Sequence, residues 1–350
     1  MQCKNFGLRK IIITFVCLIS MICINFPHTF KALAASDIKW NFSLFGGVRD
    51  ITRPLHKWSE DMNKATNGRW QIKLHYGSVL SPAKSNLDGL KAGLFEAMQI
   101  CAAYIPGKLP LHTVHELPFF LPKDAEKINQ MMCALWKHPA LLKELGKWNA
   151  VPLIPAALPQ YGLMTNKPVY NVKDLDGLRI RIAGEMARIV SQFGAVPAMM
   201  PGPDIYEAME RGTIDAVTLP WAFAFGAFKI NEVSKYAIIN FAPGSMCCPF
   251  FANKTAWDSL PDSFKKLHLD WIKDSPKIWA NEYKKGDIKW TKIYKKQMEF
   301  IEFPSEEHAK LAEKADMAYK DWVKRMEGKG LPGKEVFEYY KAKRKEIAGY

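Results

Sequence analysis

The chain has 350 residues, 48% of them hydrophobic and 24% charged, which excludes an intrinsically disordered protein and exceeds what one compact core usually takes up, so we expect two domains. Its formal net charge is +14, a field that favours encounter with small anions by electrostatic steering. The basic residues alternate with acids on carboxyl-terminal helical segments and form no recognised nucleic-acid module, so we expect no nucleic-acid partner.

The first 34 residues have the pattern of a secretory signal peptide. A positive region ends at Lys10, residues 11–24 are apolar, and Ala32-Leu33-Ala34 offers small residues for cleavage. A retained membrane anchor is the alternative, but the apolar run is short for a spanning helix. We therefore expect cleavage after Ala34 and a periplasmic protein. The removed segment holds four Lys or Arg and no Asp or Glu, which leaves 45 basic and 35 acidic residues and a net charge of +10.

Strand and helix patterns alternate in the first half of the remaining chain. Period-two alternation and short apolar runs predict strands at residues 38–44, 70–74, 96–100 and 151–158. Apolar residues at helical spacing predict helices at residues 55–62, 85–94, 125–137 and 139–145, of which Pro139 separates the last two.

Residues 174–215 contain the clearest pattern in the chain. Between Gly177 and Ile182 apolar residues alternate with Arg179 and Arg181, which predicts a strand. A helix from about Gly184 to Gly194, a strand at 196–200, a second helix ending at Gly212 and a strand at 214–219 follow. This order of strand, helix, strand, helix, strand is typical of a parallel, open α/β sheet.

The sequence pattern changes in the last third of the chain. Further strands are expected at residues 236–241 and 250–252, after which the pattern is mostly helical from Pro261 onward. A short strand at residues 299–303 interrupts the helices. Aromatic residues at helical spacing, Trp279 and Tyr283 among them, indicate helices that pack against both halves of the fold.

The same stretch resembles the signature region of a known family. GLRIRIAG at 177–184 and FGAVPAMMPGPDIYEAMERGTID at 193–215 are similar to motifs of the DctP-type solute receptors of TRAP transporters. These extracytoplasmic proteins deliver small organic anions to a sodium-coupled permease. Weaker matches extend the resemblance over most of the chain after residue 40: LDGLKAG at 87–93, PGKLPL at 106–111, ELPFF at 116–120 and NKTAWDSLPDSFKKL at 253–267.

The resemblance implies an α/β fold of two lobes, the periplasmic-binding-protein clamshell, with long carboxyl-terminal connecting helices. We expect lobe 1 at residues 35–158, completed by about 245–290, and lobe 2 at 159–244, completed by about 291–330, with a carboxyl-terminal helix at 331–350. The implied partners are a small organic anion and the small and large membrane subunits of the permease. A sensory receptor with a signalling partner has the same sequence features and is the alternative.

Arg181 is the foremost candidate for ligand binding. A guanidinium offers a planar fork of donors that matches a carboxylate, and it stays charged. Aligned on the family motif, Arg181 takes the place of the arginine that grips the substrate's carboxylate. Arg179 is better explained as a surface residue.

A second arginine is common in the family near Gln160 and Tyr161, and this chain has none there. We therefore expect a pocket with one strong charge and a monoanionic ligand, a carboxylate or alternatively a sulfonate, with an apolar or aromatic part. Tyr161 and Gln160 would stand near the missing arginine's place.

Other candidate contacts lie at strand ends that face the same cleft. Many relatives carry Glu or Asn just before the proline that stands at position 220, where this chain has Thr218 and Leu219. Trp221 after that proline recurs in some branches of the family, and the resemblance implies that it forms a pocket wall. Tyr104 and Phe45 follow the third and first strands. Phe223 and Phe225 are expected in the core.

The sequence carries no recognised catalytic or cofactor motif: it has no GxSxG elbow and no P-loop, and no GxGxxG cofactor loop follows a predicted strand. We expect a protein that is not an enzyme and that has no cofactor and no metal. His112 to Glu116 is expected in an extended segment, with ordinary packed or surface histidines. Cys101 and Cys133 are expected to be buried thiols, and no disulfide could be assigned among them and Cys247-Cys248.

Overall fold

The computed structural model describes residues 37–182 and 184–350, and the expected signal peptide lies outside them. In this part of the chain no helix is long and apolar enough to cross a membrane.

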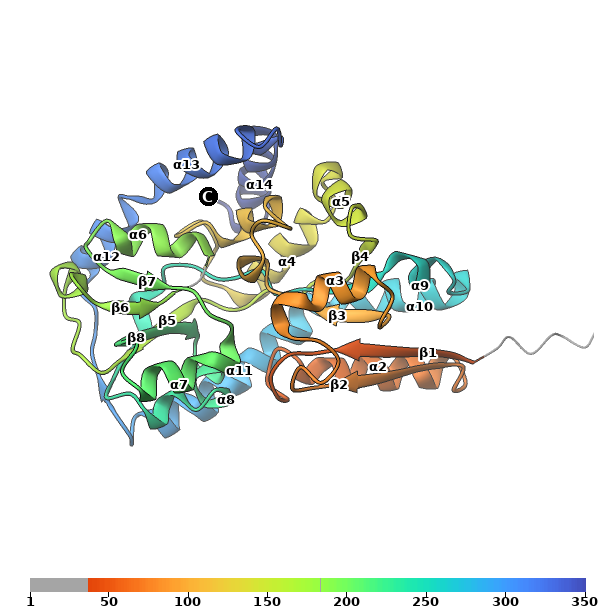
Figure 1. Ribbon diagram of the computed structural model, residues 1–350, viewed down its shortest axis with the longest axis horizontal. Helices are drawn as coiled ribbons and strands as arrows, with labels where there is room; N and C mark the ends of the chain where they lie inside the picture. The colour runs from red at the N-terminus through yellow and green to blue at the C-terminus, as the bar shows by residue number, and fades with distance from the viewer. Residues whose placement is uncertain (1–36, 183) are drawn as a thin grey trace, which may run out of the picture. The chain divides into compact units, whose positions relative to one another are not determined.

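A five-stranded sheet in the order β2-β1-β3-β10-β4 forms the centre of the first lobe (Figure 1). β1 (Ile38–Ser43) runs parallel to β2 (Trp70–His75) and β3 (Ala97–Gln99). β10 (Phe250–Asn253) lies antiparallel to β3 and to β4 (Ala150–Ile154). The expected alternation in β1 buries Trp40 and Phe42 in the core, as period-two spacing requires.

A six-stranded sheet in the order β11-β9-β5-β8-β6-β7 forms the centre of the second lobe. β6 (Arg179–Arg181) is parallel to β7 (Val196–Ala198) and to β8 (Ala216–Pro220), which confirms the parallel arrangement expected for residues 174–215. The whole sheet is mixed, because β5 (Tyr161–Thr165) is antiparallel to both β8 and β9 (Tyr236–Ile238). β11 (Glu299–Phe300) pairs in parallel with β9.

Helices cover these sheets and connect them. The first lobe carries α2 (Arg53–Ala65), α3 (Asn86–Lys91), α4 (Ala125–Leu135), α5 (Pro139–Gly146), α9 (Lys254–Asp258) and α10 (Asp262–Trp271). The second carries α6 (Ala187–Ser191), α7 (Ile205–Glu210), α8 (Phe223–Ala227) and α12 (Ser305–Ala312). Short 3-10 turns precede or follow several strands, among them η2 (Ala102–Tyr104), η3 (Leu111–Glu116), η5 (Gly184–Met186) and η6 (Gly202–Asp204). The chain ends with α13 (Ala315–Glu327) and α14 (Gly333–Ala348).

The long helix α11 (Ser275–Tyr294) is bonded to both lobes. Near its beginning Trp279 Nε1 donates to the carbonyl of Ile51 at 2.9 Å. At its end the Tyr294 hydroxyl donates to the carbonyl of Ala222 at 2.7 Å. The expected α/β fold of two lobes with long connecting helices is therefore confirmed.

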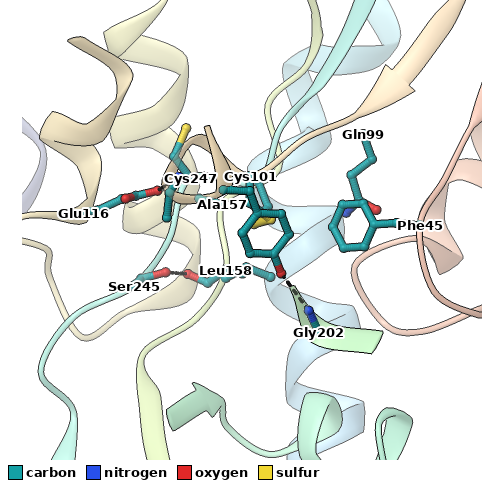
Figure 2. The surroundings of a disulfide bond; sticks show 12 residues. Phe45, Gln99, Cys101, Glu116, Ala157, Leu158, Gly202, Ser245 and Cys247 are labelled. Atoms are coloured by element: carbon teal, nitrogen blue, oxygen red, sulfur yellow. Dashed lines mark hydrogen bonds between the residues drawn. A yellow bond between two sulfur atoms is a disulfide. The ribbon is translucent and has the colours of Figure 1, made fainter. Parts of the chain in front are cut away.

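Cys101 and Cys248 form a disulfide (Figure 2), so the expectation of a free thiol at Cys101 is wrong. Cys101 follows β3 and Cys248 precedes β10, and the pairing of these strands brings the two residues together. Because 147 positions separate them in the sequence, only the sheet topology reveals the partnership. Cys133 and Cys247 are free.

The segment that contains His112 and His115 is helical (η3), which corrects the extended conformation expected for it. Both histidines are fully buried. His112 Nδ1 lies 2.6 Å from a carboxylate oxygen of Glu144, and His115 Nδ1 contacts the Tyr340 hydroxyl. These are packed histidines, one of the two environments expected for them.

Candidate functional site

A cavity of about 30 Å³ lies where segments of both lobes meet. Phe45 and Gln99 reach it from the first lobe, and Tyr161 and Arg181 reach it from the second. The volume suffices for about two water molecules, whereas ligand pockets commonly measure about 300–1,000 Å³. A ligand that needs such a volume would enter only if the residues around the cavity moved apart.

Arg181 lies at the end of β6 with its side chain buried at 1% exposure. Its Nε and Nη2 donate to the carbonyl of Met200 at 3.2 and 3.0 Å, and its Nη1 donates to the carbonyl of Thr218 at 3.0 Å. In the described part of the chain no carboxylate stands within ion-pair distance of this guanidinium. Since a guanidinium has five N–H donors, these bonds leave two donors for Tyr161 or for a ligand.

Arg179 differs from Arg181 in every respect that bears on ligand binding. Its side chain is 45% exposed and forms a bidentate ion pair with Asp215. The distance from Nη2 to Oδ1 is 2.8 Å, and the distance from Nε to Oδ2 is 2.9 Å. These bonds hold the pKa of Asp215 well below its usual range. Arg179 is thus already neutralised.

Arg49 is a second buried guanidinium on the same cavity, and the sequence interpretation missed it. Its Nη1 donates to the carbonyls of Phe45 at 2.6 Å and Gly47 at 2.8 Å, and its Nη2 donates to Gln99 Oε1 at 3.0 Å. The guanidinium carbon lies 4.8 Å from the ring centre of Phe45 and 5.6 Å from that of Phe228. Burial lowers the pKa of Arg49 to about 10, so it remains protonated at neutral pH. The expectation of one strong charge in the pocket is therefore wrong.

The glycine at position 46 allows Arg49 to fold back over the end of β1. Gly46 has φ +66°, and a β-carbon there would stand 2.7 Å from Arg49 Nη1. Phe45 was expected at the cleft because it follows the first strand, and Arg49 stands only four residues after it. Nothing local distinguished it from the other basic residues, because its burial depends on Phe228 of the second lobe.

The two tyrosines expected at the site both line the cavity. Tyr161 is almost fully buried, which raises the pKa of its hydroxyl well above the usual value, while the charge of Arg181 opposes the rise. Tyr161 therefore stays a hydrogen-bond donor. The Tyr104 hydroxyl accepts a bond of 3.1 Å from the backbone N–H of Gly202, drawn in Figure 2. Tyr104 thus bonds the first lobe to η6 of the second.

Three other expected contacts do not line the cavity in this structure. Thr218 bonds Arg181 instead: its carbonyl accepts from the Arg181 guanidinium, and its hydroxyl donates to the Arg181 carbonyl at 3.2 Å. Gln160 donates to the carbonyl of Pro122 at 3.1 Å. Contrary to the expectation of a pocket wall, Trp221 packs in the core against Tyr294 and donates to Thr291 Oγ1 at 3.1 Å.

The remaining walls of the cavity are mostly apolar. Phe223 of α8 is buried and lines the cavity, whereas Phe225 is buried without reaching it. The Cys101–Cys248 disulfide forms part of the same wall. The site thus combines two positive groups with an apolar surround, which suits a small anion with an apolar part.

Comparison with known proteins identifies the family of the chain. The family described as bacterial extracellular solute-binding protein, family 7 (DctP), matches residues 51–325. The chain belongs to this family. The resemblance expected from the signature region is confirmed, and the DctP family is made of solute-binding receptors.

Individual DctP relatives are similar over much of their length. A monocarboxylate 2-oxoacid-binding periplasmic protein of Nostoc sp. is 27% identical over 291 residues, which cover 81% of this chain and 77% of the relative. The C4-dicarboxylate-binding periplasmic protein DctP of Rhodobacter capsulatus is 28% identical over 214 residues, 59% of this chain and 61% of the relative.

Solved structures share the fold. A TRAP solute-binding protein from Rhodoferax ferrireducens in complex with copurified benzoate superposes with a TM-score of 0.78 at 22% identity, over 89% of this chain and 99% of that one. A Bordetella bronchiseptica TRAP periplasmic solute-binding protein with bound mandelate has the same TM-score, identity and coverage.

Proposed function

We propose that the protein is a periplasmic receptor of a TRAP transporter that binds a small organic anion between its lobes. The observation that carries this proposal is the pair of buried guanidiniums, Arg49 and Arg181, on one cavity. Burying a charge without a partner costs several kcal/mol, and an anionic ligand would remove that cost. The names of the DctP relatives, which bind 2-oxoacids and C4-dicarboxylates, support a carboxylate.

The apolar walls favour a ligand with an apolar or aromatic part. The rings of Phe45, Phe223 and Phe228 surround the cavity, and aromatic side chains bury large apolar area. The structures with benzoate and mandelate show that this fold accepts aromatic acids in other proteins. A sulfonate can accept two N–H bonds from an arginine through two of its three oxygens, and it is a second candidate for the anionic group.

Release of the ligand to the membrane permease would follow opening of the two lobes. The proposed partners are the small and large permease subunits, which take the ligand without covalent chemistry. We propose no catalytic role for the cavity, since the polar side chains that line it in the described residues are two arginines, two tyrosines and an amide, without a carboxylate, an imidazole or a free thiol.

A thermal-shift screen of organic acids and sulfonates tests the proposal. A ligand at about 100 times its Kd stabilises the folded state by about 2.7 kcal/mol, which is a clear rise in Tm. Arg181→Lys keeps the charge and loses the planar fork, so we expect it to weaken binding at least about tenfold. Arg179→Lys, on the same strand, is the matched control and should bind as wild type does. Equal affinity in both variants would overturn the role of Arg181.

A further inference from the structure

Gln99 is the one amide side chain on the cavity within residues 37–182 and 184–350, and its orientation is fixed by its neighbours. Arg49 Nη2 donates to Gln99 Oε1 at 3.0 Å. Because a guanidinium can only donate, the amide oxygen must face Arg49 and the amide nitrogen must face away from it. Figure 2 labels the side chains of Gln99 and Phe45, which both line the cavity.

The backbone of Gln99 is equally well held. Its carbonyl accepts from Asn86 Nδ2 at 2.9 Å, and Asn86 Oδ1 in turn accepts from Ser43 Oγ at 2.8 Å. Gln99 also pairs with Phe250 across β3 and β10. The side chain therefore starts from a rigid strand, and the position of its amide is set before a ligand arrives.

The amide nitrogen of Gln99 has no hydrogen-bond partner within the described residues, although the side chain is fully buried. A buried donor without an acceptor is unfavourable, and such groups are rare in folded proteins. Its place on the lining of the cavity suggests that the missing acceptor belongs to the ligand.

We propose that the ligand carries a second oxygen acceptor besides its anchoring carboxylate, and that Gln99 Nε2 and Arg49 recognise it. The carboxylate lies on Arg181 from the second lobe, and the second oxygen lies on the Arg49–Gln99 pair from the first. A ligand of this kind is a 2-oxo or 2-hydroxy carboxylate, or a short dicarboxylate. It bridges the two lobes through its two polar groups. This inference rests on the proposed function.

Matched ligands test the second oxygen. Phenylacetate, mandelate and benzoylformate share one carbon skeleton and differ by no oxygen, a hydroxyl or a ketone at the carbon beside the carboxylate. Butanoate, 2-hydroxybutanoate, 2-oxobutanoate and succinate form an aliphatic set. Calorimetric titration of the full chain should show that an oxygenated member binds about tenfold or more tightly than the unsubstituted acid.

Two variants assign that preference to Gln99. Gln99→Met removes the donor and the acceptor, and Gln99→Glu keeps the oxygen for Arg49 and removes the N–H. Both should reduce the preference for the oxygenated acid to about threefold or less. Gln71→Met, an exposed glutamine of β2, is the control for the substitution and should keep the wild-type preference.

The outcomes separate the two proposals. The assignment of Gln99 is overturned if wild type binds acids with and without the second oxygen equally tightly. It is also overturned if both Gln99 variants keep the preference for the oxygenated acid. In either case the receptor function stands. If no acid of either set binds and the wider screen of organic anions is also negative, the proposed function fails and this inference fails with it.

Discussion

Gly162 in β5 lies directly against the indole ring of Trp221. A β-carbon added to Gly162 would stand 2.6 Å from Cε3 of that ring and 3.4 Å from the carbonyl oxygen of Ile238. The absence of a side chain at one residue therefore makes room for the largest side chain at the other.

Gly162→Ala should destabilise the second lobe. The added methyl must displace Trp221, and overpacking of this kind costs about 1–3 kcal/mol. Urea unfolding measures the loss. Gly146→Ala at the end of α5, where an added β-carbon meets no atom within 4 Å, is the control. A Gly162 variant as stable as the control would show that Trp221 shifts freely.

Removing the Cys101–Cys248 disulfide should lower the free energy of unfolding by about 2–5 kcal/mol, because a cross-link over a long loop restricts the unfolded chain. The variant Cys101→Ala with Cys248→Ala should also bind ligand more weakly, since the bridge lines the cavity. Unfolding curves with and without dithiothreitol give the first result and titration gives the second. Cys133→Ala, which changes a free cysteine, should still be destabilised by dithiothreitol as wild type is. The double variant should unfold in the same way with and without dithiothreitol.

His268 should make the protein less stable in weak acid. Trp58 Nε1 donates to His268 Nδ1 at 3.1 Å, so Nδ1 is unprotonated and Nε2–H donates to the carbonyl of Leu153 at 2.9 Å. Burial lowers the pKa of His268 to about 4, against about 6.5 in an unfolded chain. Between these pH values the unfolded state binds more protons, so stability falls as pH falls from about 6.5 to 4.

The variant His268→Gln isolates this contribution. It should be less stable than wild type at pH 7 and should lose less stability between pH 7 and pH 4.5, as followed by urea unfolding. His56→Gln, at an exposed position, should keep the wild-type slope. A wild-type slope in His268→Gln would mean that the imidazole accepts a proton in the folded state.

Glu116 should have the opposite pH dependence. One of its carboxyl oxygens accepts from the backbone N–H of Ala103 at 3.0 Å, and the other is buried without a partner among the described residues. Burial, and then the charge of Glu185, raise the pKa of Glu116 well above its usual range. The folded state thus retains a proton that the unfolded state releases, and stability is lost as pH rises toward the folded pKa.

The isosteric variant Glu116→Gln remains neutral at every pH. It should match wild type near pH 4 and exceed it in Tm at pH 8. The measurement is a thermal melt over that range. If both proteins lose stability in parallel as pH rises, Glu116 is already ionised in the folded state.

The local patterns predicted most elements because local spacing determines which face of an element is buried. The alternation in β1 and the helix break at Pro139 both correspond to observed boundaries. β5 was missed because all five of its residues are buried, and a short apolar run without alternation has no diagnostic period.

The site was harder to predict than the fold. Arg181 was predicted from the family motif, and it lines the cavity with N–H donors that its bonds to backbone carbonyls do not occupy. Arg49 and Gln99 carry no local signature, since they meet only when β1 and β3 pair. Trp221 was expected at the pocket because of the family resemblance, but its ring packs in the core, in the space that the glycine in β5 leaves open.

The order of the first sheet has a consequence for how the chain folds. β10 lies between β3 and β4, yet it is made only after all of β5 to β9. Until then β3 and β4 each have an open edge, and exposed strand edges are sites of aggregation. Pairings over such long sequence separations also form slowly, because the loops between them must close first. The first lobe therefore cannot complete its sheet as an independent unit, because β10 must be present before β3 and β4 are joined.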